Sequence, residues 1–266
     1  MKPLHVILAV AALVLGQSAA DEGPKKRRPL PHEFGRVIIQ THSQKAGLAP
    51  VVFDHWLHRA KFTCRLCHVD VGFAMKAGAT GIRAADNAEG QYCGACHNGH
   101  TRFDGKKMFE ACSKGGAVSL RATCVRCHSL GKDVKPENDF ATVTRSLPRG
   151  RFGNGVDWEK AELDKLIKPV DYLEGISIKR TPLSAQRDFA LSPKLEGMPE
   201  IIFSHVKHTV WNGCELCHPE IFVGVKRGAT KYTMLDIFDG KYCGACHVTV
   251  AFPLLDCQRC HAKPVR

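Results

Sequence analysis

The sequence predicts a mostly irregular chain with short α-helices, organised as two copies of one unit. Three observations lead to this prediction. The 266-residue chain contains six Cys-x-x-Cys-His motifs. Residues 53–97 align without gaps with residues 203–247, and 19 of the 45 positions are identical. Gly and Pro residues are scattered through both copies, and segments with a helical or strand period are few.

Every Cys-x-x-Cys pair in the chain is followed directly by His. The motifs are Cys64-Cys67-His68, Cys93-Cys96-His97, Cys124-Cys127-His128, Cys214-Cys217-His218, Cys243-Cys246-His247 and Cys257-Cys260-His261. This is the attachment motif of c-type haem. Its spacing places both sulfurs on one side of a turn, where they bond to the two vinyl groups, and the His lies under the iron as proximal ligand. The sequence therefore predicts six covalently bound haem c groups and a core dominated by haem.

Zinc and disulfide bonds are the alternative uses of these cysteines. A zinc site needs two such pairs to converge and does not need His after each pair. The chain has 13 cysteines, an odd number that argues against a simple disulfide framework. Cys112 lies outside every motif, and we interpret it as a small buried hydrophobic side chain or an unpaired thiol.

Residues 1–20 have the pattern of a secretory signal peptide. Lys2 is followed by an apolar run at 6–16 and by small residues up to Ala20, where cleavage is expected. The apolar run is too short to span a bilayer, so we expect no stable membrane insertion. The sequence thus predicts an exported protein, located in the periplasm or outside the cell.

The motifs and the repeat divide the remaining chain into four parts. These are a basic N-terminal arm (21–48), a first three-haem unit (49–130), a haem-free connector (131–199) and a second three-haem unit (200–266). The stretch from Ser129 to Glu200 contains no Cys and no His, and a short helix is predicted from Trp158 to Ile167. We interpret the two units as a duplication.

The formal charge of +12 by itself favours an acidic partner, nucleic acid or a membrane surface. Each haem carries two propionates, however, and six haems would offset much of this charge. Nucleic-acid binding is therefore not expected.

Two further histidine pairs precede the first motif of each copy. They lie in Phe53-x-His55-x-x-His58 and Phe203-x-His205-x-x-His208. A spacing of three residues places both rings on one helix face but separates them along the helix. One such helix can therefore serve two different haems.

This arrangement resembles the class III multihaem cytochromes c, and in particular the trihaem cytochrome c7 type of bacterial periplasms. The resemblance covers residues 53–128 and 203–261. It implies a compact cluster of closely spaced haems with little regular structure. It also implies the distal ligands: His55 for the haem on Cys64/Cys67, His58 for Cys93/Cys96, His205 for Cys214/Cys217 and His208 for Cys243/Cys246.

The sequence departs from this family at the third haem of each unit. The family has a His just before the second motif, whereas residues 88–92 and 238–242 contain none. Met234 is a candidate distal ligand in the second copy, because thioether sulfur is a known axial ligand. Its counterpart in the first copy is Ala84, where Met75, His100 and His42 are the candidates. The alternative is an open iron position.

Electron transfer is the function that these features predict. One-electron sites in series would carry electrons between redox protein partners, from a donor to a terminal reductase or an outer-membrane conduit. No catalytic residue is predicted, and the protein is not expected to be an enzyme. The alternatives are a multihaem oxidoreductase with one open haem and a haem protein that assembles into a filamentous wire.

Overall fold

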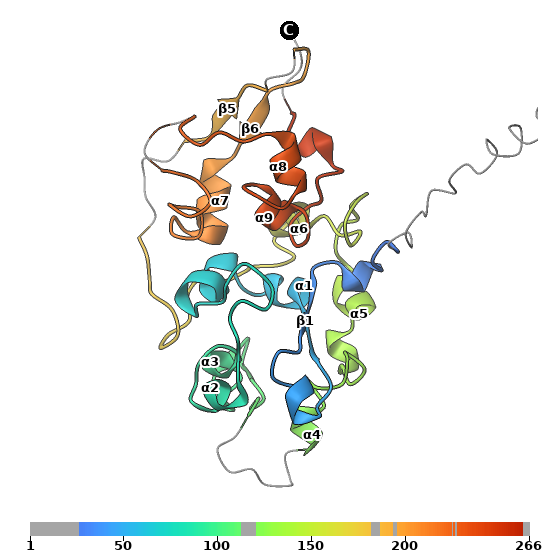
Figure 1. Cartoon of the computed structure of the whole chain (residues 1–266). Helices are drawn as coiled ribbons and strands as arrows, with labels where there is room; N and C mark the ends of the chain where they lie inside the picture. Colours follow the sequence, from blue (N-terminus) through green and yellow to red (C-terminus); the bar gives the residue numbers. More distant parts are fainter. Residues whose placement is uncertain are drawn as a thin grey trace, which may run out of the picture.

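The computed structural model describes residues 27–112, 121–181, 187–193, 196–224, 226 and 228–262. The signal peptide predicted for residues 1–20 lies outside these residues. The described part contains only short helices and two-stranded sheets joined by irregular segments, which confirms the predicted fold class (Figure 1). None of its helices has the length and apolar character needed to cross a membrane.

The helices are α1 (His55–Arg59), α2 (Ala84–Ala88), α3 (Cys93–Cys96), α4 (Arg121–Cys124), α5 (Phe140–Thr144), α6 (Trp158–Leu163), α7 (His205–Asn212), α8 (Met234–Phe238) and α9 (Gly244–His247). The strands are β1 (Arg36–Ile39), β2 (Val51–Asp54), β3 (Arg102–Phe103), β4 (Lys106–Lys107), β5 (Phe189–Leu191) and β6 (Ile201–Phe203). Single turns of other helical types occur at Pro31–Glu33, Gln44–Ala46, Leu66–Asp70, Pro136–Asn138 and Cys257–Arg259.

An antiparallel hairpin opens each unit and leads directly into its histidine helix. Strand β1 pairs with β2, and β5 pairs with β6. The hairpins correspond in register, because Val37 faces Phe53 and Phe189 faces Phe203. Strand β1 lies in the segment predicted as an arm, and β5 lies in the predicted connector. Each unit therefore draws a strand from outside the aligned repeat.

The second attachment motif of each unit is packed tightly against the preceding helix. A Cβ atom on Gly94 would lie 1.9 Å from the carbonyl oxygen of Asn87, and one on Gly244 would lie 1.9 Å from that of Ile237. Only glycine allows this approach. The repeated Cys-Gly-Ala-Cys-His sequence thus has a steric reason at its second position, which is independent of haem chemistry.

The connector supplies most of the buried apolar cluster of the described residues. Trp158 and Ala161 of α6 pack with Trp56, Leu147 and Val156, and Ala161 is 0% exposed. Asp157 begins the helix, because its side chain accepts a hydrogen bond from the backbone N–H of Lys160. The helix predicted from Trp158 to Ile167 is confirmed but ends earlier, at Leu163, just before the left-handed Lys165 (φ 59°).

The α6 packing gives a stability prediction. We expect Trp158→Ala to lower the free energy of unfolding of the holoprotein by about 3–5 kcal/mol, because it removes a large side chain from the buried cluster. Urea unfolding followed by far-ultraviolet circular dichroism measures this change. Leu163→Ala is the matched control on the same helix, since Leu163 is 67% exposed, and should cost about 0.5 kcal/mol or less. Equal effects would show that α6 is not packed as described.

Candidate functional site

Each Cys-x-x-Cys-His motif forms one helical turn that presents its functional atoms on one side. In five motifs the backbone N–H of the His donates to the carbonyl of the first Cys, at 2.8–3.0 Å. Residues one turn apart on a helix share a face. Both sulfurs and the imidazole therefore project together, as attachment to one flat cofactor requires.

Four pairs of imidazole rings face each other across the interior. The ring centres are 6.4 Å apart for His55 and His68, 6.4 Å for His58 and His97, 6.5 Å for His205 and His218, and 6.2 Å for His208 and His247. Each pair joins one ring from a histidine helix to one ring from an attachment motif.

These distances fit two imidazoles that share one metal ion. A bond between a transition metal and an imidazole nitrogen is about 2 Å long, so the two nitrogens lie about 4 Å apart. Adding the roughly 1 Å from each nitrogen to its ring centre gives about 6 Å. The other ring pairs of the described residues have centres between 4.3 Å (His247 and Phe252) and 6.1 Å (His208 and Trp211) apart, so these four pairs have the widest spacings. The four pairs are thus spaced for an intervening metal.

The second ring nitrogen of most of these histidines bonds to a backbone carbonyl. The Nδ1–O distances are 2.6 Å for His55 and Gly35, 2.8 Å for His68 and Phe73, 2.8 Å for His208 and Ser204, 2.7 Å for His218 and Phe222, 3.1 Å for His247 and Phe252, and 3.4 Å for His58 and Asp54. A carbonyl only accepts, so Nδ1 carries the proton and donates it. The unprotonated Nε2 then remains free for a metal, and the ring orientation is fixed.

Burial keeps the paired imidazoles in the form that binds metals. Burial, followed by the neighbouring His97 ring, lowers the pKa of His58 to about 3. Burial also lowers the pKa of His97 and of His247 to about 4. A ligating imidazole must be neutral. These rings therefore need no deprotonation to act as ligands at neutral pH.

A phenylalanine fixes the second ring of each histidine helix. The Phe53 ring lies 4.4 Å from that of His58, and the Phe203 ring lies 4.5 Å from that of His208, with interplanar angles of 31° and 29°. Phe203 is the last residue of β6, and Phe53 is the last but one of β2. The first letter of the F-x-H-x-x-H pattern therefore has a packing role at the site.

The third motif of each unit is oriented in the same way in both copies but has no facing imidazole among the described residues. His128 donates to the carbonyl of Ala49 at 2.7 Å, and His261 donates to that of Pro199 at 2.9 Å. Ala49 and Pro199 occupy equivalent positions in the repeat. The two motifs are therefore equivalent, although the chain between the second and third motifs differs in length.

The predicted distal candidates for these two motifs separate into two groups. Met75 and Met234 line a large interior cavity and are exposed. Met234 is the first residue of α8. His42 and His100 do not line this cavity, and His100 is exposed. Met108, which the sequence analysis did not consider, also lines the cavity. Its position between the second and third motifs was the signal that could have identified it.

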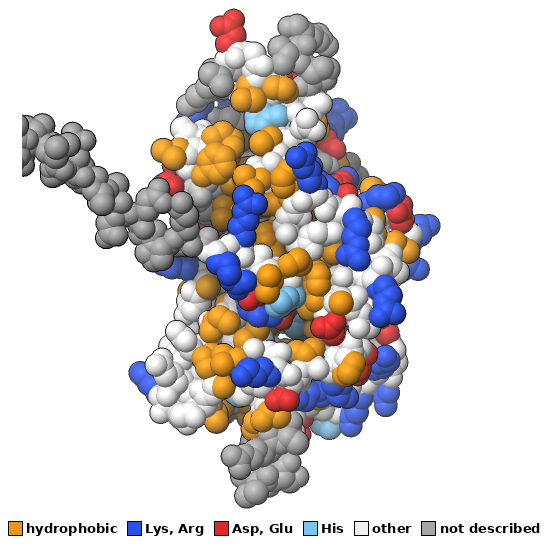
Figure 2. Space-filling view, turned by 90° about the vertical axis from the view of Figure 1, so that its right-hand side faces the viewer, with side chains coloured by type: hydrophobic (Ala, Val, Ile, Leu, Met, Phe, Trp, Pro, Cys, Tyr) orange, Lys and Arg blue, Asp and Glu red, His pale blue; other side chains and the backbone are white. Residues whose placement is uncertain are grey.

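One connected cavity of about 3370 Å³ joins the sites. It is lined by cysteines from all six motifs and by all eight paired histidines. An ordinary ligand pocket measures about 300–1,000 Å³, so this space is several times too large for one small ligand. Figure 2 shows that the surface is hollowed near the middle of one face, where hydrophobic side chains surround a histidine. Such a cavity fits several large apolar groups.

The cysteine geometry bears on the two alternative chemistries. None of the 13 cysteines forms a disulfide bond. No cluster of three or more His, Cys, Asp or Glu side chains in the described part is placed to hold a metal ion by itself, as a zinc site would require. Cys112 is half-buried, and burial, followed by the neighbouring Cys124, raises the pKa of its thiol. A thiol in that state is protonated and unreactive.

Repeated attachment turns, paired imidazoles and a shared apolar cavity define a multihaem c-type cytochrome. The family model for cytochrome c7 and related cytochrome c matches residues 51–129 and 201–262. The chain belongs to this family. The resemblance to the c7 type that the sequence predicts is therefore confirmed.

Several solved structures are similar to this chain. A c7-type three-heme cytochrome domain is 37% identical over 30% of this chain and 95% of its own length, with a TM-score of 0.25. The C-terminal hexaheme fragment of GSU1996 is 24% identical over 88% of this chain and 98% of its own (TM-score 0.25). The dodecaheme cytochrome c GSU1996 is 26% identical over 85% and 74% (TM-score 0.26). No curated protein matches the chain.

The thirteenth cysteine gives a prediction about attachment. We expect Cys112→Ala to leave the covalent haem content unchanged, because Cys112 belongs to no attachment turn. Cys96→Ala should remove one thioether bond from the second motif. Denaturing gel electrophoresis with haem staining and tryptic mass spectrometry separate the two results. A loss of covalent haem in Cys112→Ala would contradict this assignment.

Proposed function

We propose that this protein is a periplasmic six-haem cytochrome that carries single electrons between redox protein partners. The observation that supports this most is the set of four facing imidazole pairs at 6.2–6.5 Å. Each pair combines a histidine of a motif with a histidine that the family resemblance implies as its distal partner. The bound haem supplies one-electron exchange between ferric and ferrous iron.

In this proposal the side chains fall into three groups. The attachment cysteines are Cys64, Cys67, Cys93, Cys96, Cys124, Cys127, Cys214, Cys217, Cys243, Cys246, Cys257 and Cys260. The proximal ligands are His68, His97, His128, His218, His247 and His261. The distal ligands are His55, His58, His205 and His208, with Met234 proposed for the haem on Cys257/Cys260.

The facing imidazole pairs favour carriage of electrons over substrate chemistry. A haem iron bound by both rings of such a pair would have no coordination position left for a substrate. The carbonyl bonds to Nδ1 hold each ring in place, so little reorganisation accompanies a change of charge. The chain itself therefore positions the haems and tunes their potentials, through burial and nearby charge.

A second function follows from the third motifs. His128 and His261 have no facing imidazole among the described residues. If Met75, Met108 or Met234 does not bind there, one iron would be open and the protein could act as an oxidoreductase. Carbon monoxide binding to the reduced protein separates the two functions. A fully closed carrier leaves its reduced spectrum unchanged, and an open site shifts the Soret band.

The intact mass of the exported protein tests haem number and export together. We expect the mass of residues 21–266 plus six haem groups, because six motifs follow a cleavable signal. The pyridine haemochrome assay against total protein gives an independent haem count. A mass that includes residues 1–20, or fewer than six haems on a fully loaded preparation, would contradict the corresponding part of the proposal.

The distal ligands can be tested one at a time. His58→Ala should convert about one sixth of the haem from low-spin to high-spin, because its iron loses a buried distal ligand. Electron paramagnetic resonance of the oxidised protein measures this fraction. His100→Ala is the control, since His100 is exposed and lies outside the cavity lining. An unchanged low-spin spectrum in His58→Ala would remove His58 from the ligand set.

A further inference from the structure

The first attachment turns of the two units meet at equivalent positions that carry opposite charges. Arg65 follows the first cysteine of Cys64-x-x-Cys67, and Glu215 follows that of Cys214-x-x-Cys217. The two residues are counterparts in the repeat. Where two identical surfaces meet about a two-fold axis, a residue at the axis meets its own counterpart, and like charges there would repel. One arginine and one glutamate avoid this repulsion.

A network of four side chains links these two turns, which we call the clasp (Arg65, Asp70, Arg180, Glu215). Arg180 Nη1 donates to Asp70 Oδ1 at 2.7 Å, and its Nε donates to Glu215 Oε1 at 3.0 Å. Arg65 Nη1 lies 3.8 Å from Asp70 Oδ2. Asp70 belongs to the turn of the first motif, and Arg180 comes from the connector. The clasp therefore joins first unit, connector and second unit.

The centre of the clasp is buried. Arg65 is 2% exposed as a residue, and the Asp70 side chain is 1% exposed. Arg65 also donates to the backbone carbonyls of Asp171 and Ile178 in the connector. Removing one partner from a buried charge pair is strongly destabilising. Separating the buried Arg65 and Asp70 side chains would therefore be costly, and this holds the two turns in their relative positions.

The backbone of the second unit also approaches Arg65 closely. A Cβ atom on Gly213 would lie 2.5 Å from Arg65 Cδ and 2.8 Å from Glu215 Oε2. Gly213 has a φ of +66°, which favours glycine. The counterpart of Gly213 in the first unit is Thr63. The second copy therefore carries a glycine where the first unit packs against it.

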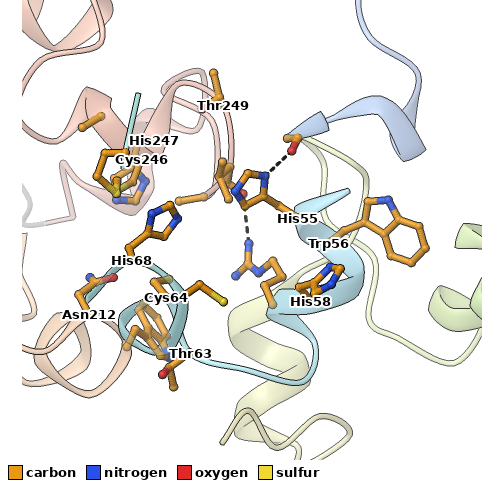
Figure 3. Close-up of a pocket in the computed structure, with 18 of the residues that line it drawn as sticks. His55, Trp56, His58, Thr63, Cys64, His68, Asn212, Cys246, His247 and Thr249 are labelled. Atoms are coloured by element: carbon orange, nitrogen blue, oxygen red, sulfur yellow. Dashed lines mark hydrogen bonds between the residues drawn. The ribbon is translucent and has the colours of Figure 1, made fainter. Parts of the chain in front are cut away.

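The cysteines that bind haem converge at the same place. Cys64 of the first unit and Cys217 and Cys246 of the second unit line the same cavity. Figure 3 shows His68 of the first motif lying between Cys64 and the pair Cys246 and His247, across one cavity. Cys64 thus shares this cavity with cysteines of the first and second motifs of the other unit.

We propose that the clasp makes the haem on Cys64 and Cys67 the point of electron exchange between the two units, with the haems on Cys214/Cys217 and Cys243/Cys246 as its neighbours. This inference rests on the proposed electron-carrier function. Haems held by these cysteines would supply one-electron exchange, in which one iron would lose the electron that its neighbour gains, with no bond formed or broken and no proton moved.

The third motif of each unit then lies further from the contact between the two first motifs, which we call the junction. Helix α4, which ends in Cys124, lies at the lower end of Figure 1, and β5 and β6 lie near the upper end, while α1 is central. His261 is bonded to Pro199, next to β6. The third motifs of the two units are thus placed towards opposite ends of the molecule, where they can meet outside partners.

The pairwise redox interactions of the intact protein test this inference without any variant. Partial reduction with sodium dithionite, followed by nuclear magnetic resonance of assigned haem methyl signals, gives the oxidised fraction of each haem. Electrostatic interaction weakens with distance, so the strongest interaction between the units should involve the haem on Cys64/Cys67. If the strongest one involves the haem on Cys93/Cys96 or Cys124/Cys127, the inference is overturned.

A charge variant tests the role of the clasp itself. Asp70→Asn removes a buried negative charge that favours the ferric form, so it should raise the potential of the Cys64/Cys67 haem more than that of any other haem in the first unit. Glu220→Gln is the matched control, because Glu220 is the repeat counterpart of Asp70 but is exposed. The assignment would be contradicted if Glu220→Gln raised the potential of the Cys64/Cys67 haem as much as Asp70→Asn does. It would also be contradicted if Asp70→Asn raised the potential of the Cys124/Cys127 haem more than that of the Cys64/Cys67 haem.

Glu215→Gln gives the same information if Asp70→Asn does not fold. The Glu215 side chain is half-exposed, and its loss should raise the potential of the Cys214/Cys217 haem and leave that of the Cys257/Cys260 haem nearly unchanged. A larger change in the potential of the Cys257/Cys260 haem than in that of the Cys214/Cys217 haem would overturn the inference. Failure of the electron-carrier function is distinguishable, because it would appear as missing haems or as carbon monoxide binding. If all six haems are low-spin but their strongest interaction lies elsewhere, only the inference about the junction fails, and the electron-carrier function stands.

Discussion

The structure depends on imidazole rings held a fixed distance apart across an interior that side chains do not fill. Nine hydrophobic side chains are buried in the described residues, and five of them form the cluster beside the connector. The cavity replaces a conventional core. Helices α1 and α7 carry the histidine rings that face the motifs, and α3 and α9 carry cysteines of the second motifs, so these short elements shape the cavity wall.

The connector is the second structural element on which the arrangement depends. Helix α6 buries Trp158 and Ala161 against the first unit. Its opposite side is acidic and faces the second unit: Glu159 pairs with Lys207 and Arg259, and Glu162 accepts from the indole N–H of Trp211 at 2.9 Å. The segment 131–199, which contains no Cys and no His, therefore contacts both units that carry the facing imidazole rings.

The sequence predicts those parts of the site whose chemistry is local and repeated. The attachment turns follow from spacing alone, and the His55 and His58 pair was recognisable because it recurs in the second copy. The carbonyls of Gly35 and Ala49 could not be predicted, since they approach His55 and His128 through tertiary folding. Strand β5 was missed because it lies outside the aligned repeat. The distal side of His261 differs between the copies, so the repeat gave no guidance there.

Helix α1 has only five residues, yet it carries one ring for each of two sites. The separation of these rings along the axis is therefore set by three residues, or about 4.5 Å. Unwinding this one turn would separate both ring pairs at once. If His55 and His58 bind iron as proposed, the two sites would therefore be lost together, and one disturbance in α1 would change the spectra of two haems at the same time.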